Sequence, residues 1–234
     1  MFGAANNPFG SVTMNFSRAT IRSSPYVGVF CSATDEFALV PHSIQTKEQK
    51  LIGEKLDVRT VRTSIGNSGL LGVLAKGLGG KLVVSSLIED AERRQLEKEG
   101  IELLVLGENF TATGNLIAVN SKAGVASPLF SDQTVKRIGG FFGVKFEKMV
   151  VAGSELAGAC ITVTNKGLIT NPNISEKDFG RLEALFGVKG RATTANYGDL
   201  FVGNSVIANS KGVIAGEKTS GIELSKIDEG LRGE

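Results

Sequence analysis

The chain has 234 residues, of which 41% are hydrophobic and 21% charged, an ordinary composition for a globular protein long enough to bury a core. Its net charge of +2 is too weak a basic bias for a protein whose binding rests on nucleic acid alone. It has no apolar run of the roughly 18–20 residues that span a bilayer. The first residues show no basic segment followed by an apolar stretch, so we expect no secretory signal, and the two cysteines fit a protein of the reducing cytoplasm.

The first predicted element is a strand at residues 14–21, where polar and apolar residues alternate. After it, a glycine-containing apolar segment recurs five times. The recurring glycines are Gly28, Gly72, Gly114, Gly158 and Gly203. By subtraction, the intervals between them are 44, 42, 44 and 45 residues. Near-constant spacing of this kind indicates a repeat architecture, so the chain is predicted to consist of five similar units.

Each unit is predicted to open with two strands joined by a tight turn. Small and polar residues, in four cases with glycine, form a turn six to ten residues after each recurring glycine. The predicted turns lie at residues 34–36, 79–81, 121–124, 165–167 and 210–212. Apolar or β-branched residues flank them, as strands joined by a hairpin require.

A helix and a third strand are predicted to follow each hairpin. The helix starts carry residues typical of capping boxes. The predicted pairs are Thr46 with Gln49, Ser86 with Glu89, Ser175 with Asp178 and Ser220 with Glu223, and Ser131 takes the equivalent place in the third unit. Third strands are predicted at residues 58–62, 101–106, 144–151 and 188–193. The fifth unit lacks one.

Five ββαβ units can bury their apolar strands by closing around a pseudo-five-fold axis, whereas an open solenoid needs capping repeats that the sequence does not show. We expect the strand at 14–22 to fill the vacancy in the fifth unit, because a closed ring leaves no open sheet edge there. The predicted fold is therefore an α+β five-bladed propeller forming a single domain over residues 14–234. Its units span about 23–65, 66–109, 110–153, 154–198 and 199–234, and residues 1–13 are predicted to be a disordered extension.

Short motifs in the third to fifth units resemble those of the translation initiation factor 6 family, archaeal type. They read TGNL at 113–116, VTNKG at 163–167, TANYG at 194–198, IANSKGV at 207–213 and TSGIEL at 219–224. The resemblance covers about residues 14–231. It implies the pentein fold, which has catalytic and non-catalytic branches.

The resemblance also implies a function. Family members bind the large ribosomal subunit on the face that would meet the small subunit, near a ribosomal protein beside the sarcin–ricin loop and its adjacent rRNA. They block subunit joining by occupancy and accompany maturation of the large subunit, and partner proteins of that pathway release them. For this chain the resemblance implies a cytoplasmic monomer with no catalytic residue, cofactor or metal.

The candidate ribosome-binding residues follow from the recurring glycines and the residues after them. They are Gly72, Val73, Gly114, Asn115, Gly203 and Asn204. Asn115 matches the asparagine that belongs to the ribosome-facing end in the family, although a loop-capping role is the alternative. Eukaryotic members carry a basic residue at the place of Val73. The glycines are explained first by close backbone approach at a crowded end of the ring.

Lysine recurs in four of the predicted turns, as Lys81, Lys122, Lys166 and Lys211. Contact with rRNA phosphates is one interpretation, but hairpin turns favour such residues in any case, and we prefer that explanation. Reversing all four charges is therefore expected to change subunit binding little. A large, salt-dependent loss of binding would show that the lysines contact RNA.

Two other functions stay open on the sequence: a guanidino-modifying pentein enzyme, and a scaffold with a non-ribosomal partner. The enzyme would need a cysteine nucleophile with histidine and carboxylates. The only histidine is His42, and both Cys31 and Cys160 fall inside apolar segments, where an inert thiol is expected. A non-catalytic protein is the preferred prediction.

Overall fold

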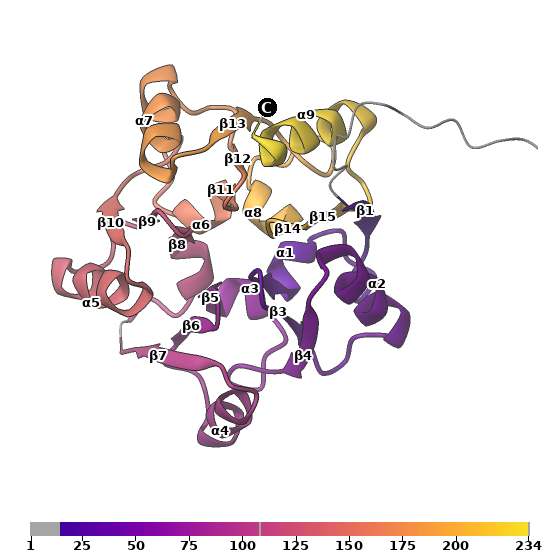
Figure 1. The fold of residues 1–234 in the computed structure, drawn as a ribbon, viewed down its shortest axis with the longest axis vertical. Helices are drawn as coiled ribbons and strands as arrows, with labels where there is room; N and C mark the ends of the chain where they lie inside the picture. The colour runs from indigo at the N-terminus through magenta and orange to yellow at the C-terminus, as the bar shows by residue number, and fades with distance from the viewer. Residues whose placement is uncertain (1–14, 108, 234) are drawn as a thin grey trace, which may run out of the picture.

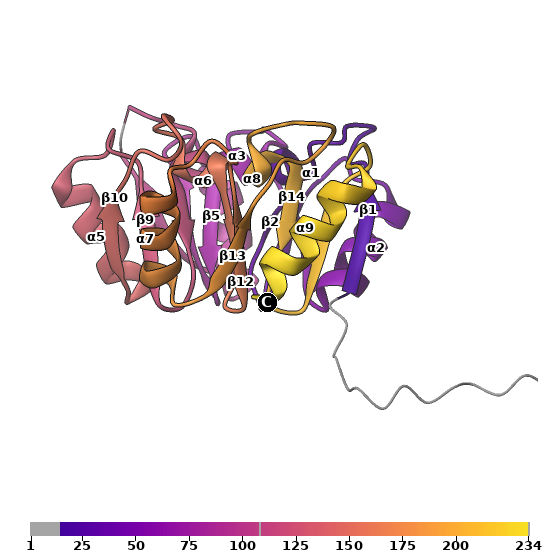
Figure 2. The ribbon, with the colours of Figure 1, turned by 90° about the horizontal axis from the view of Figure 1, so that it is seen from above.

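The computed structural model describes residues 15–107 and 109–233, and these form five three-stranded sheets arranged as blades around one axis (Figure 1). The predicted extension at residues 1–13 lies outside the described residues. Seen from the side, the molecule is a thick disc with its long helices on the rim (Figure 2). The predicted five-fold ring of ββαβ units is confirmed.

The first four blades have the same order of elements, and the fifth differs only in taking its third strand from the start of the chain. A one-turn helix near the axis leads into a short inner strand, and an antiparallel middle strand follows. A long outer helix then returns the chain to a third strand, parallel to the middle one. The one-turn helices are α1 (Val27–Phe30), α3 (Leu71–Leu74), the 3-10 helix η1 (Thr113–Leu116), α6 (Ala157–Cys160) and α8 (Val202–Ser205). The inner strands are β2 (Ser32–Ala33), β5 (Ala75–Leu78), β8 (Ile117–Val119), β11 (Ile161–Val163) and β14 (Val206–Ala208).

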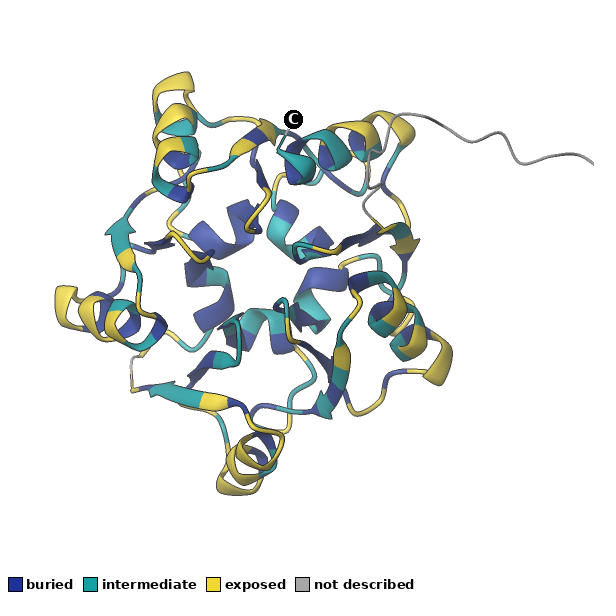
Figure 3. Cartoon of the chain, viewed as in Figure 1, coloured by how far each residue is buried: buried dark blue, intermediate teal, exposed yellow. Residues whose placement is uncertain are grey.

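The middle strands are the most buried part of each blade. They are β3 (Phe37–Pro41), β6 (Lys81–Ser85), β9 (Ala123–Ala126), β12 (Gly167–Thr170) and β15 (Gly212–Gly216). The long helices that cover them are α2 (Thr46–Leu56), α4 (Asp90–Lys98), α5 (Asp132–Phe142), α7 (Glu176–Phe186) and α9 (Gly221–Arg232). Figure 3 shows the result, a buried inner ring inside helices that expose only their outer surfaces.

The outer strands are β4 (Arg59–Thr63), β7 (Glu102–Leu106), β10 (Lys145–Lys148), β13 (Lys189–Ala192) and, in the fifth blade, β1 (Asn15–Ala19). β1 pairs in parallel with β15, from Asn15 opposite Gly212 to Ala19 opposite Gly216. The first strand of the chain therefore occupies the place that each other blade fills from within its own repeat.

This topology gives the disc two different ends. Middle strands begin at the hairpin turns and run to the opposite end, and the outer strands run parallel to them. We call the end with the turns around Asp35, Gly79, Ser121, Asn165 and Ser210 the hairpin end. The opposite end carries the one-turn helices and is called the glycine end (Figure 2).

The sequence placed three of the five long-helix starts correctly. The hydroxyls of Ser131, Ser175 and Ser220 each accept a hydrogen bond from the backbone N–H three residues later. The predictions for α2 and α4 were wrong, because those helices begin after Gln45 and Glu89. Gln45 and Glu89 are the N-cap residues of these two helices. The backbone N–H of each donates to the glutamate three residues later, Gln45 to Glu48 and Glu89 to Glu92.

Candidate functional surface

The six candidate residues all lie in one-turn helices at the glycine end, which the structure brings together around the axis. Gly72 and Val73 belong to α3, Gly114 and Asn115 to η1, and Gly203 and Asn204 to α8. The three residues that follow the glycines are half-buried. Asn115 lines the axial cavity together with all five recurring glycines.

The recurring glycines touch one another in a closed ring. A Cβ on Gly28 would overlap the carbonyl oxygen of Gly203, and one on Gly72 would overlap that of Gly28. The same relation holds for Gly114 against Gly72, Gly158 against Gly114, and Gly203 against Gly158. The one-turn helices pack backbone to backbone, so these glycines set the diameter of the ring.

The glycine end also exposes apolar side chains that the sequence analysis did not single out. The residue immediately before each one-turn helix is apolar and at least partly exposed: Tyr26, Leu70, Ala112, Leu156 and Phe201. Tyr26 is 43% exposed and Leu70 is 38% exposed. The signal was present in the sequence, because each of these residues stands two positions before a recurring glycine.

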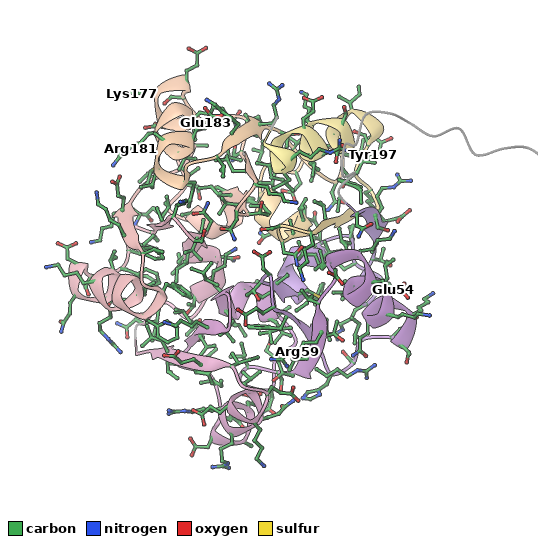
Figure 4. All side chains as sticks on the ribbon, viewed as in Figure 1. Glu54, Arg59, Lys177, Arg181, Glu183 and Tyr197 are labelled. Carbon is green, nitrogen blue, oxygen red and sulfur yellow. The ribbon has the colours of Figure 1, made fainter. Side chains whose placement is uncertain are left out.

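Exposed apolar side chains at the glycine end are not limited to the residues that precede the one-turn helices. Among the described residues, the exposed large hydrophobics are Tyr26, Leu70, Leu87, Phe110, Val150, Tyr197, Leu200 and Ile222. Each lies after the end of a middle or outer strand and before or at the start of the next helix, which places it at the glycine end. Tyr197, which is 82% exposed, lies beside α9 (Figure 4). A gathering of this kind on one face is typical of a protein-binding surface.

Buried glutamates hold the loops of the glycine end in shape. Glu223 of α9 accepts hydrogen bonds from the backbone N–H groups of Tyr197 and Gly198, whose φ angles are +64° and +99°. Glu92 of α4 does the same for Gly66 and Asn67 in the second blade. Because the carboxylates satisfy these backbone donors, loops with left-handed backbone present a fixed surface.

The hydrogen bonds also control the ionisation of Glu223. Burial raises its pKa, but donation from the Ser220 backbone, the Thr194 hydroxyl and the Gly198 backbone outweighs burial and lowers the pKa to about 2. Glu92 shows the same balance, and its pKa is lowered by donors from Glu89, Ser64, Asn67 and Gly66. Both groups are therefore charged at neutral pH.

We expect Glu223 to make folding stability depend on pH. Its folded pKa of about 2 lies below the pKa of 4.5 of an unperturbed glutamate, so its contribution is full above pH 4.5 and is lost as pH falls from there towards 2. The loss should be on the order of 2–3 kcal/mol. Urea unfolding at several pH values should show a shallower acid loss for Glu223→Gln than for the natural chain. The exposed Glu217→Gln is the control, and an equal change in both variants would contradict the assignment.

At the hairpin end, two of the recurring lysines have structural partners. The Lys81 ammonium donates to the Phe141 carbonyl in the last turn of α5, at 2.6 Å. The Lys211 ammonium donates to the carbonyl of Asp57, the residue that ends α2, at 2.7 Å. Cations at helix C-termini satisfy free carbonyls and complement the helix dipole.

Buried asparagines join neighbouring blades at the same end. The Asn209 amide donates to the carbonyls of Thr34 and Leu56 in the first blade, at 3.0 and 2.8 Å. Its side-chain oxygen accepts from the backbone of Lys211 and Gly212, which closes its own turn. Asn120 makes the equivalent bonds from the third blade to the carbonyls of Thr164 and Phe186.

Both cysteines are buried in the ring. Burial, reinforced by the charge of Glu48, raises the pKa of the Cys31 thiol. Burial likewise raises the pKa of Cys160. His42 is exposed. Across residues 15–107 and 109–233, no cluster of three histidine, cysteine or acidic side chains could hold a metal ion. In the same part of the chain, no helix has both the length and the hydropathy to cross a membrane.

Comparison with known proteins finds relatives that match nearly the whole chain. The chain is similar to translation initiation factor 6 of Pyrococcus horikoshii, at 37% identity over 93% of this chain and 99% of the relative. It is 42% identical to translation initiation factor 6 of Natronomonas pharaonis, over 92% of this chain and 97% of the relative. Among solved structures it resembles a DDAH variant from Pseudomonas aeruginosa complexed with citrulline, with 15% identity, a TM-score of 0.43, and coverage of 89% of this chain and 73% of that one. Residues 16–230 match the model of the eIF-6 family, and the chain belongs to that family.

Proposed function

We propose that this protein binds the large ribosomal subunit through its glycine end and so prevents premature association with the small subunit. The observation that carries the choice of surface is the gathering of exposed large hydrophobics there, from Tyr26 and Leu70 to Leu200. Large apolar side chains gain free energy when a partner covers them.

The mechanism is occupancy and includes no catalytic step. A factor that only excludes another particle needs a preformed face of adequate area, because each group that must be ordered on binding reduces affinity. The closed ring of glycines and the loops fixed by Glu92 and Glu223 supply such a face. The buried, protonated thiols of Cys31 and Cys160 support a non-catalytic role.

Within the proposed contact, Asn115 and Asn204 supply polar groups beside the apolar residues, the mixture found in many protein interfaces. Val73 would add an apolar contact at the place where eukaryotic members carry a basic residue. The partner we propose is a ribosomal protein near the sarcin–ricin loop, with adjacent rRNA, in the cytoplasm. The proposal extends to large-subunit maturation and to release of the monomeric factor by proteins of that pathway.

The test is co-sedimentation with purified large subunits, followed by reassociation with small subunits. Leu70→Glu introduces a charge that would be buried on docking, so it should weaken binding at least tenfold and restore reassociation. Ala184→Glu places the same charge on the exposed outer face of α7 and should bind normally. Equal behaviour of the two variants would exclude the glycine end as the docking surface.

Two further variants compare the two ends of the disc. Asn115→Ala removes one polar group from the proposed contact, so we expect a loss of about 1–2 kcal/mol in subunit affinity with an unchanged unfolding midpoint. The combination Lys122→Glu and Lys166→Glu reverses two charges at the hairpin end and should leave affinity within about twofold. A large, salt-dependent loss in the double variant would instead assign binding to the hairpin end.

A further inference from the structure

The ring encloses a polar cavity on its axis, which runs from the residues of the glycine end, Asn115 among them, towards the hairpin end. The cavity has a volume of about 50 Å³, enough for a few water-sized groups. Its wall includes Ala33, Gly77, Val119, Val163 and Ala208. The same five residues line a wider mouth of about 270 Å³ at the hairpin end, so the cavity continues into that opening.

One lysine stands in the wall of this cavity. Lys76 lies on β5, four residues after its recurring glycine, and the equivalent positions in the other blades are Ser32, Ala118, Thr162 and Ile207. Lys76 is thus the one charged residue at this level of the ring. Within the described ranges its ammonium has no hydrogen-bond or ion-pair partner. Burial lowers the pKa of Lys76 to about 8, so the amine is still mostly protonated at pH 7.

A second polar group in the same wall also lacks a partner. Thr162 on β11 is only 7% exposed, and its hydroxyl is buried without a hydrogen bond among the described residues. Thr162 lines the cavity together with Lys76. The unpaired hydroxyl of Thr162 is buried and the ammonium belongs to the half-buried Lys76, so both offer donors to the same small space.

We propose that the axial cavity is a binding site for a small monovalent anion, held by the ammonium of Lys76 and the hydroxyl of Thr162. An anion of the size of chloride fits the volume, compensates the charge and accepts both donors. It would also join the second and fourth blades across the axis. Among the described residues, neither carboxylate at the mouth, Asp35 or Glu36, makes a hydrogen bond or ion pair with Lys76. Asp35 accepts from Ser210 and Asn165, and Glu36 lies beside Gly79 and Gly80.

Chloride is the probe for the test. The ³⁵Cl relaxation rate of a chloride solution should rise in the presence of the natural protein, and nitrate should reverse the rise by competition. Lys76→Met keeps a similar volume without the charge and should abolish the effect. Lys50→Met removes an exposed lysine on α2 and should leave the effect intact. No excess relaxation with the natural protein, or the same excess with Lys76→Met, would overturn the proposal.

Stability gives an independent readout. Urea unfolding at constant ionic strength, with chloride replacing gluconate, should raise the midpoint of the natural protein and saturate. Lys76→Met should show no such dependence and should be the more stable of the two in gluconate, because it buries no uncompensated charge. If Lys76→Met does not fold, Thr162→Val replaces it and should weaken chloride binding several-fold. A midpoint of the natural protein that is insensitive to the anion would contradict the site.

Discussion

Replacing Gly114 with alanine should prevent the ring from closing. A Cβ at this position would overlap the carbonyl oxygen of Gly72 and lie 2.6 Å from that of Ala75. Both obstacles are backbone atoms of the neighbouring blade, so no side chain can move aside to relieve the clash. We expect a loss of at least about 4 kcal/mol in unfolding free energy, or no folded protein. Urea unfolding followed by circular dichroism measures it.

The matched control is the same substitution at Gly180, in the interior of α7. A Cβ there meets no atom within 4 Å, and the helix already has room for a side chain. Gly180→Ala should therefore stabilise the protein by about 0.5–1 kcal/mol, because alanine has the higher helix propensity. Tolerance of alanine at Gly114 would show that the glycines do not set the diameter of the ring.

The second large effect is expected at Asn209, which joins the last hairpin to the first blade. Its side chain is 3% exposed and makes four hydrogen bonds, two of them to carbonyls of Thr34 and Leu56 in the first blade. Asn209→Ala leaves those carbonyls and two turn N–H groups without their partner. The expected loss is about 3–5 kcal/mol in unfolding free energy.

Two comparisons make the Asn209 result specific. Asn120→Ala breaks the equivalent bonds between the third and fourth blades and should cost a similar amount. Asn173→Ala alters an exposed asparagine and should change stability by less than about 0.5 kcal/mol. Losses of under 1 kcal/mol in unfolding free energy at both Asn209 and Asn120 would show that these amides do not hold neighbouring blades together.

The five-fold fold could be predicted because the repeat is visible in the sequence itself. Each recurring glycine marks the same place in a similar unit. The ends of elements were less predictable. The third strand of the third unit was expected at 144–151 but is β10 (Lys145–Lys148), because the residues after it form the turn bridged between Val151 and Ser154. The N-cap serine expected at Ser86 lies in the turn after β6, and Glu89 takes its place.

The surface was harder to predict than the ring. Leu87, Val150 and Ile222 stand at different places in their repeats, so no sequence period connects them, and only the direction of the strands places them at one end. Lys76 likewise stands out from the other strand residues only once closure of the ring places it and Thr162 in the wall of the same cavity. Which residues of different units come together depends on how the units pack against one another, and the repeat pattern within the sequence does not reveal that packing.

The pairing of β1 with β15 also determines when the ring can close during synthesis of the chain. Asn15 emerges early from the translating ribosome, yet its partner Gly212 is 197 positions later by subtraction. The intervening blades can assemble as they are made, but the nascent disc stays unsealed until synthesis has passed Gly216. Contacts between such distant residues form slowly. Closure therefore follows synthesis of β15, and until β1 pairs with it one edge of β15 is available for pairing with other chains.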